Sequence, residues 1–589
     1  MTDGFSRRHL LRLSGGLVAT SALAGCQSQP TGDTTAATTT DPGSRSRTLA
    51  LIGGPIRTLD PAKAADENSV KVLTQLYEGL LHFPKGNPDP ELLLADDVSV
   101  SDDGLTYTFS LDPTVEFSTG DGLTAADVAY SFERVAQSTN SSWRSYLLSM
   151  LGVVHEMEGD EYVPGSLGVT AVDDSTVAIE LQQATHNGLE LLAHPAFAVV
   201  PEGLVGDIEG YEGSVEYETF ATQSSYGTGP FTLESWSQGD HYRVRAREDY
   251  HGDGPNIAGI DWAVIESDTA YDYAMGLDAD AFWVPDARFD RSLLDVDHVD
   301  EQGRLVGTYG PLPENGITAN YLGVPLLWMY FIGFNTQSVA KPVRQAVAYA
   351  MNQQAHLEQV HKGRGALSAH VTPPPLLFDD REARTEHADS AYPYGLDTSD
   401  LEAAREVMEA AGYSESNPAD VTFTVYQNST WRQSAQILQN QLKSVHVNID
   451  IEQAEFGTMY SRGQNGTLEM FSWAWAMDYP AAESFLSILV PGTDNPVFTN
   501  WGGTEAAAQA SEAWEQITEH STRSAEDQEI RAAAYRQMEE ANWQDVTVLP
   551  KYQPLGEGFY YPWLSLPKTG AAGFSKHTYN DVTIGPRDT

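Results

Sequence analysis

The amino-acid sequence predicts an α/β protein built from several domain-sized units. Two observations support this prediction: helical and strand patterns interleave along the body, and no long linker divides it. The 589 residues correspond to roughly three to four units of ~150 residues each. With 41% apolar residues the chain can form several cores, so a largely disordered protein is excluded. We therefore expect lobes formed by a chain that crosses back and forth between them.

The predicted elements follow one another along this body. A turn at 101–104 leads into an alternating strand over 105–111, and Thr124 then begins a helix with Asp127 at its third position. Apolar stripes at helical spacing predict a helix that starts at Lys341 and another over 401–411, which Gly412 ends. Alternation predicts further strands over 176–181, 242–246 and 447–452.

The charge is strongly negative. Lys and Arg number 34, Asp and Glu number 83, and the formal net charge is −49. A phosphate backbone would repel such a chain, so nucleic-acid binding is excluded as its main function. Self-repulsion would also destabilise the compact state, except in molar salt, where the screening length falls to about 3 Å. We interpret the acidity as adaptation to a salt-loving, haloarchaeal-like organism; a moderately acidic secreted protein is the alternative.

The N-terminal segment carries export signals. Arg7 and Arg8 precede a short, weakly apolar stretch, which indicates a twin-arginine signal peptide over residues 1–25. The sequence Leu23-Ala24-Gly25-Cys26 is similar to a lipobox, which implies cleavage before Cys26 and lipid attachment to its sulfur. The Ser/Thr-rich residues 26–47 predict a disordered tether. We therefore expect the body at the cell surface, anchored through Cys26 to the outer face of the cytoplasmic membrane.

A series of short motifs runs through residues 48–585. In order they are Leu59-Asp60-Pro61, Gln75 to Leu80, Asp102 to Phe109, Gly120 to Val128, Gly227-Thr228-Gly229-Pro230-Phe231, Phe334-Asn335, Val343 to Ala350 and Met477-Asp478-Tyr479-Pro480. In this order they resemble family 5 of the extracytoplasmic solute-binding proteins, which serve peptide and nickel ABC transporters. The resemblance implies a protein without catalytic activity that delivers a solute to permease and ATPase subunits on other chains.

The resemblance also implies a two-lobed periplasmic-binding-protein-like clamp of type II with an extra inserted domain. Chain crossings near Gly227–Phe231, Phe331–Asn335 and the late 540s would form its hinge region. We expect a monomer. The predicted bounds are 48–79, 216–330 and 556–589 for lobe I, 80–215 for the inserted domain and 331–555 for lobe II.

The resemblance points to Asp478 as the first candidate ligand-binding residue. In peptide-binding relatives an aspartate before an aromatic-Pro or Asn-Pro turn holds the α-ammonium of the ligand. The alternative role of Asp478 is to cap the turn formed by Tyr479 and Pro480. Trp473 and Trp475 precede Asp478 and alternate with Phe471, so the three side chains point the same way. We predict Phe471 in the core. Trp475 would form a pocket wall, stack on a ligand, or pack in the core.

A second candidate region is a predicted loop that often lines the pocket in relatives. It contains Tyr426, Asn428 and Trp431, for which an ordinary polar loop is the alternative. Some relatives place an arginine for a peptide carboxylate six residues before the aspartate, where this chain has Ser472. Arg432 or Arg462 would substitute for it, or lie on the surface. The predicted ligand-binding residues are thus Asp478, Trp475, Trp473, Tyr479, Trp431 and Asn428.

Metal binding and catalysis receive little support from the sequence. His356 and His361 lie five residues apart, which is not the spacing that places two metal ligands on one helix face. We therefore expect these two residues and His370 to be solvated surface histidines. We expect neither a metal nor a cofactor. The sequence has no phosphate-binding loop, zinc-protease motif or nucleophile elbow. Sequons for N-glycosylation occur at Asn140, Asn428 and Asn465.

These predictions together favour a receptor for di- or oligopeptides. An oligosaccharide-binding or nickel-chelate-binding member of the same family is the nearest alternative. A secreted hydrolase is the competing class, because counting carboxylates alone does not exclude a glycosidase.

Overall fold

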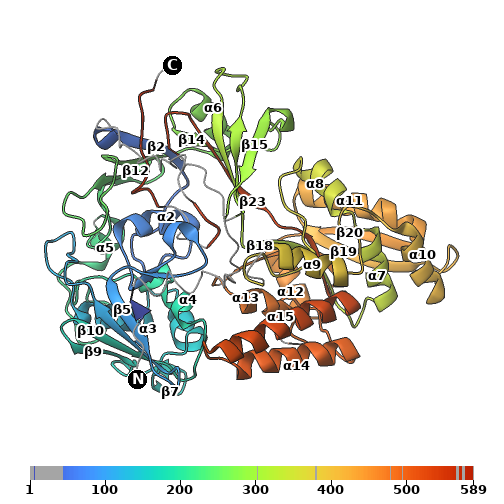
Figure 1. Cartoon of the computed structure of the whole chain (residues 1–589), viewed down its shortest axis with the longest axis horizontal. Helices are drawn as coiled ribbons and strands as arrows, with labels where there is room; N and C mark the ends of the chain where they lie inside the picture. The colour runs from blue at the N-terminus through green and yellow to red at the C-terminus, as the bar shows by residue number, and fades with distance from the viewer. Residues whose placement is uncertain are drawn as a thin grey trace, which may run out of the picture.

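The structure is a computed structural model that describes residues 5–6, 44–223, 225–301, 303–377, 381–477, 479–493, 495–565, 569–572 and 578–587. Cys26 and Asp478 lie outside these residues, as do the predicted signal peptide except Phe5–Ser6 and residues 26–43 of the predicted tether. Within the described residues, the helices are all too short or too polar to cross a membrane. The architecture is α/β, with two lobes that stand side by side in Figure 1.

The segment predicted as the inserted domain contains an antiparallel sheet, and a strand from outside the predicted bounds, Phe5–Ser6, joins its edge. Its strands lie in the order β1 (Phe5–Ser6), β5 (Ala95–Val100), β6 (Thr106–Leu111), β10 (Thr176–Glu180) and β9 (Val169–Asp173). Helix α3 (Ala125–Gln137) packs against β9 and β10, and it begins with the predicted capping box of Thr124 and Asp127. The smaller elements are the strand pairs β3 (Leu81–His82) with β4 (Glu91–Leu92) and β7 (Met157–Glu158) with β8 (Glu161–Tyr162), a π-helix at Tyr146–Met150, and α4 (Gly188–Leu192).

Lobe I contains two sheets. One has the order β11 (Phe231–Ser237), β12 (His241–Ala246), β13 (Gly259–Val264) and β2 (Thr48–Gly53); the other has β14 (Ala281–Phe282), β23 (Leu555–Tyr560), β17 (Ala319–Pro325), β16 (Leu305–Tyr309) and β15 (Leu294–Val299). Its helices are α2 (Glu67–Leu76), α5 (Tyr217–Thr222) and α6 (Ser267–Met275). One continuous hydrophobic core joins both sheets, and the fully buried Trp262 and Tyr561 belong to it.

Lobe II surrounds one mixed sheet. Its strand order is β20 (Val447–Ala454), β19 (Ala419–Tyr426), β21 (Met470–Ala476), β18 (Trp328–Phe334) and β22 (Val548–Tyr552). The paired helices α14 (Glu505–Glu519) and α15 (Ala525–Asp545) run below this sheet and reach toward α4 of the inserted domain (Figure 1). The helices of the lobe are α7 (Lys341–Ala350), α8 (Gln353–His361), α9 (Arg381–Ala391), α10 (Leu401–Ala410), α11 (Ser429–Leu442), α12 (Phe456–Gln464), α13 (Ala482–Leu486), α14 (Glu505–Glu519) and α15 (Ala525–Asp545).

Two short segments join the sheets of lobe I and lobe II. Leu326 and Leu327 connect β17 to β18, and Gln553 and Pro554 connect β22 to β23. The two segments are bonded to each other, because the Leu326 amide donates to the Pro554 carbonyl at 3.0 Å and Gln553 Nε2 donates to the Leu326 carbonyl at 2.7 Å. The crossings expected near Phe331–Asn335 and in the late 540s were therefore wrong. Residues 331–334 are buried within strand β18, and the late 540s lead into strand β22. Prolines, which interrupt sheet ladders, mark both true crossings.

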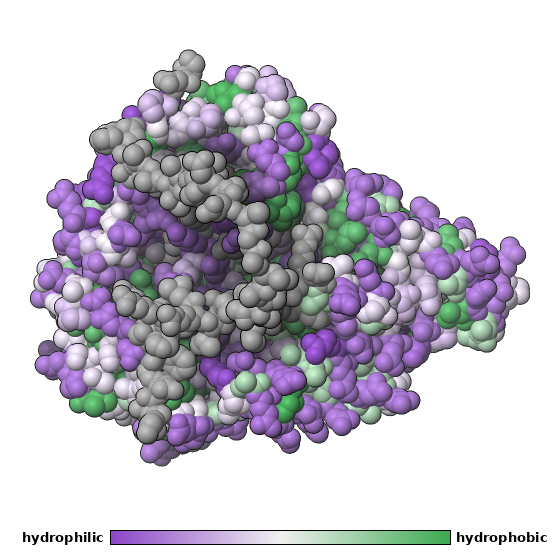
Figure 2. Space-filling view, viewed as in Figure 1, coloured by the Kyte–Doolittle hydropathy of each residue, from purple (hydrophilic) through white to green (hydrophobic). Residues whose placement is uncertain are grey.

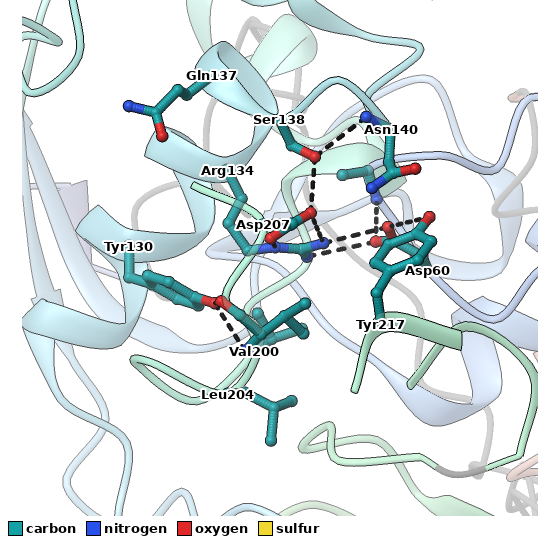
Figure 3. Close-up of polar contacts among 12 residues, drawn as sticks. Asp60, Tyr130, Arg134, Gln137, Ser138, Asn140, Val200, Leu204, Asp207 and Tyr217 are labelled. Carbon is teal, nitrogen blue, oxygen red and sulfur yellow. Dashed lines mark hydrogen bonds and ion pairs between the residues drawn. The ribbon is translucent and has the colours of Figure 1, made fainter. Parts of the chain in front are cut away.

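A buried ion cluster joins the inserted domain to lobe I (Figure 3). Arg134 of α3 contacts Asp60 at 3.1 Å and Asp207 at 2.9 Å, and its side chain is 2% exposed. Ser138 Oγ donates to Asp207 at 2.6 Å, and the Tyr217 hydroxyl donates to Asp60 at 3.2 Å. Burial alone would raise the pKa of Asp207, but Arg134 outweighs it and holds that pKa below its usual range. The Leu59-Asp60-Pro61 motif therefore has a structural role here.

The two glycines of the Gly-Thr-Gly-Pro motif lie where there is no room for a side chain. The Ser118 amide donates to the Gly227 carbonyl at 2.9 Å, and the Gly229 amide donates to the Leu76 carbonyl at 3.1 Å. A Cβ atom at Gly227 would lie 2.2 Å from that same Leu76 oxygen. This position, between the inserted domain and β11, therefore requires glycine because the backbones approach so closely.

Candidate functional site

The carboxyl ends of several strands meet at one edge of the lobe II sheet. Strand β19 runs parallel to β20 and β21, while β18 runs antiparallel to β21 and β22. Strands β19, β20, β21 and β22 therefore end at the edge where β18 begins. Open α/β sheets bind ligands outside the carboxyl ends of their strands, so this edge is the candidate site.

Aromatic side chains collect at this edge. Trp328 is 41% exposed, Tyr426 37%, Phe456 53% and Tyr460 41%, and these four with Trp431 and Trp473 are called the aromatic edge below. The rings contact one another in two groups: Phe456 lies with Trp473 and Tyr460, at centroid distances of 5.2 and 6.2 Å, and Tyr426 lies with Trp431 at 6.5 Å. Among the described residues, Trp283 of lobe I is the one other exposed large aromatic side chain. Figure 2 shows that hydrophilic residues cover much of the face in view.

The structure brings most of the predicted residues of β21 to this region. Phe471 is fully buried in the core, as predicted, and Trp473 and Trp475 lie on the same side of the strand, each half-buried. The Trp475 indole donates to the Ser484 carbonyl at 2.7 Å, which fixes the ring against α13. Tyr479, also half-buried, packs against the hydrophobic core of the inserted domain. Trp475 therefore forms a fixed wall, and Tyr479 bridges lobe II and the inserted domain.

The predicted loop around Asn428 and Trp431 is instead the start of helix α11. Asn428 is the N-cap residue, and its side chain accepts a hydrogen bond from the Thr430 amide at 2.7 Å. Trp431 lies in the first turn, with its ring centroid 5.6 Å from that of Tyr330. The residues Asn428-Ser429-Thr430 supply a capping signal that could have revealed the helix. Of the two predicted substitutes for an arginine, Arg432 is exposed and Arg462 pairs with Glu452 at 2.7 Å.

Sequence reasoning missed a buried lysine next to Ser472. Lys551 Nζ donates to Ser472 Oγ at 3.1 Å and lies 5.3 Å from the centre of the Trp431 ring. The residue is 3% exposed, and burial lowers the pKa of Lys551 to about 7. The signal in the sequence was a single cation between the apolar residues 548–550 and Tyr552.

The expectation of surface histidines was wrong for His356 and His370, which are 3% and 1% exposed. Burial, followed by the charge of Lys551, lowers the pKa of His356 to about 2. His370 contacts His387 at 2.9 Å, and His387 contacts Glu540 at 2.9 Å. Helix α8 and the segment after it lie under other elements, so these histidines fill core positions. The described residues contain no group of three side chains that could hold a metal ion.

Ion pairs connect lobe II to the inserted domain. Glu483 of α13 contacts His186 at 2.8 Å and accepts from Asn187 at 3.2 Å, and it also accepts from the Tyr535 hydroxyl. Arg523 contacts Glu190 at 2.6 Å. Burial works to raise the pKa of Glu483, but the bonds from His186 and Tyr535 outweigh it and hold that pKa below its usual range. Relative motion of these two parts would have to break or rearrange these contacts.

Lobe II also contacts lobe I beside a crevice of about 820 Å³ lined by residues 287–291 of lobe I and by α8 and the residues after it. Arg364 contacts Asp286 at 2.6 Å and also pairs with Glu557 of β23. Its guanidinium lies 5.8 Å from the centre of the exposed Trp283 ring. The crevice takes one wall from each lobe, so its shape depends on how the lobes are oriented.

Comparison with known proteins places this arrangement in a family. The family model for bacterial extracellular solute-binding proteins, family 5 middle, matches residues 89–496. The glutathione-binding protein GsiB of Salmonella typhimurium is 27% identical over 462 residues, which cover 76% of this chain and 78% of the relative. The unliganded open form of the murein tripeptide binding protein MppA superposes with a TM-score of 0.70 at 20% identity, covering 92% of this chain and 97% of MppA. Haemophilus influenzae OppA in complex with the peptide RPPGFSPFR gives a TM-score of 0.60 at 18% identity, covering 92% of this chain and 99% of OppA. The chain therefore belongs to the family 5 extracellular solute-binding proteins.

Proposed function

We propose that this protein is the substrate-binding component of an ABC importer and that it captures a di- or oligopeptide between its lobes. It performs no chemistry, and it delivers the solute to permease and ATPase subunits on other chains. Family membership supports this assignment. The names of its relatives support a peptide ligand, since one is a glutathione-binding protein, another a murein tripeptide binding protein, and a third holds a nonapeptide.

The aromatic edge carries the proposal. Soluble proteins rarely leave aromatic rings exposed together unless the patch binds something. Here four exposed rings stand at the carboxyl edge of the lobe II sheet, the place where ligands bind in such sheets. Two short segments of the described chain join the sheets of the two lobes, which suits hinge closure over a ligand at this edge. Closure would remove the rings from water and strengthen polar contacts to the ligand.

The remaining sequence predictions complete the proposal. Twin-arginine export would carry the protein across the membrane. A lipid on Cys26 would then hold the body at the outer face of the membrane, next to its permease, where it would act as a monomer. Asp478 would bind the α-ammonium of the peptide, because a carboxylate in a closed site requires a cation to offset its desolvation. The acidic composition would keep the receptor soluble in concentrated salt.

Thermal-shift measurements in molar KCl test this function. A ligand that binds only the folded state at 100 times its Kd stabilises it by about 2.7 kcal/mol, which raises the Tm. We expect an increase with di- to pentapeptides, and we expect Asp478→Asn to reduce it. Asp450→Asn is the matched control, because Asp450 is an exposed aspartate on β20 of the same lobe.

Four outcomes would contradict parts of the proposal. An increase with oligosaccharides alone, or with Ni²⁺ or a nickel chelate alone, would keep the receptor role and replace the ligand. A peptide response unchanged in Asp478→Asn would remove that residue from the site. Turnover of a peptide or sugar by the purified protein would favour a hydrolase. A Tm that no member of the panel changes would refute solute capture by this chain.

A further inference from the structure

Lys551 occupies an irregular position at the edge where the ligand is proposed to bind. In the pairing of β18 with β22, Tyr330 lies opposite Tyr552 and Phe331 opposite Pro550, so Lys551 is the extra residue of a bulge. A bulge redirects the side chain of the extra residue. That side chain reaches the neighbouring strand β21, where Nζ contacts Ser472.

The ammonium group is buried without an anionic partner among the described residues. Lys551 is 3% exposed, and its described contacts are the Ser472 hydroxyl at 3.1 Å and the Trp431 ring at 5.3 Å. Among the residues that the structure describes, no carboxylate lies within ion-pair distance of Nζ. An ammonium has three N–H donors, and a buried charge without a counter-ion is costly. A site that retains such a charge has the properties needed to receive an anion.

The groups around Lys551 do not supply that anion. On α8, His356 and His361 have pKa values lowered to about 2 and 4, first by burial and then by the Lys551 charge, so both are neutral at pH 7. Beyond them Arg364 is matched by the carboxylates of Asp286 and Glu557. Burial raises the pKa of Tyr330 and Tyr552, which keeps both hydroxyls neutral. Within the described part of the chain, Lys551 is therefore an unmatched charge of this cluster.

The half-buried Trp431 ring packs against this charge. It also contacts Tyr330 and the exposed Tyr426. Within the described part of the chain its indole N–H donates to no other group. An N–H donor at the aromatic edge and a cation behind it are together suited to a carboxylate.

We propose that the ligand carries a carboxylate and that Lys551, positioned by Ser472, forms with Trp431 the subsite that receives it. The inference rests on the proposed function and refines it: for a peptide, the C-terminal end lies toward Trp431. A bound carboxylate would offset the cost of the buried ammonium and hold its proton more firmly. Binding near neutral pH would then take up a proton, and affinity would fall as the pH rises above about 7.

Calorimetric titration in molar KCl tests the subsite with trialanine, trialaninamide, glutathione and maltotriose. We expect wild type to bind trialanine about tenfold or more tightly than the amide, as a hydrogen bond to a charged group predicts. We expect Lys551→Met to lose this preference and Lys551→Arg to retain part of it. Lys443→Met is the matched control, since it removes an exposed lysine from the C-terminal end of α11.

Stability separates a binding role from a structural one. If Lys551 serves the ligand, replacing its buried charge with Met is expected to raise the Tm of the empty protein. A lowered Tm together with an unchanged acid preference would identify a structural lysine and overturn the inference. Equal binding of trialanine and trialaninamide by wild type would overturn it without any variant, while leaving solute capture intact. If none of the four compounds binds, the proposed function fails and the inference fails with it.

Discussion

Arg134→Met is the change whose effect the structure predicts most directly. The substitution removes the cation from a cluster in which Arg134 is 2% exposed, Asp60 0% and Asp207 8%. Two buried carboxylates would then face each other without a counter-charge. Breaking a buried ion pair by removing one partner costs about 3–5 kcal/mol, and buried pairs remain poorly screened even in molar salt.

The size of the Tm shift also reports the cooperative unit. The unfolding entropy is about 2.1 cal/mol/K per residue, so a unit of roughly 140 residues, the size of the predicted inserted domain, would lose about 10–17 °C. If the whole folded chain of roughly 540 residues unfolds together, the loss would be about 3–4 °C. Differential scanning calorimetry in molar KCl distinguishes the two cases.

The control for this experiment is Arg144→Met, which removes an exposed arginine that follows the same helix and is expected to change the Tm little. Replacing Asp60 and Asp207 with asparagine in the Arg134→Met background is expected to recover part of the loss, because the two charges disappear. A Tm within about 1 °C of wild type for Arg134→Met would refute the assumption that these carboxylates stay buried and charged.

Three further predictions concern other parts of the molecule. Gly227→Ala is expected to cost about 1–3 kcal/mol or more, because its Cβ would lie 2.2 Å from the Leu76 oxygen; denaturant unfolding measures this against Gly254→Ala, where the space is open. Glu483→Gln is expected to flatten the acid limb of the Tm–pH curve. The depressed pKa of Glu483 stabilises the folded state at pH values above the ordinary pKa of a glutamate, and this stabilisation is lost as the pH falls. The Tm–pH curve of the control Glu512→Gln should match that of wild type. Burial raises the pKa of Glu539 to about 7. The free energy of unfolding of wild type should therefore fall by up to about 3 kcal/mol as the pH rises from about 4.5 to 7, whereas that of Glu539→Gln should not. A Tm–pH slope that is the same in wild type and Glu539→Gln would contradict this.

Most of the fold could be predicted from local sequence. The capping box at Thr124 and Asp127 is present, and the helix predicted from Lys341 begins there with proline in its first turn. The strand predicted over 447–452 is present and extends to Ala454. These features depend on periodicity and capping, which neighbouring residues determine. The bounds of the three predicted domains stay a prediction.

The candidate site was less predictable because it depends on contacts between distant segments. Trp473 and Trp475 could be recognised from strand alternation, but the burial of His356 depends on how α8 packs against β22 and α11. The partners of Lys551 come from β21 and α11, and a bulge directs its side chain. A bulge shifts the register by one residue, which no periodic pattern in a single strand reveals.

The route of the chain through lobe II has a consequence for its origin and for engineering. The chain enters and leaves this lobe through two adjacent segments, and the strands that flank them, β17 and β23, are already an antiparallel pair with Pro325 opposite Leu555. A turn of two residues between these positions would close β17 and β23 into an ordinary hairpin. Lobe II thus has the topology of a cassette placed in a hairpin loop of lobe I. Exchanging residues 326–554 between relatives would transplant the aromatic edge and the Lys551 subsite as one genetic unit.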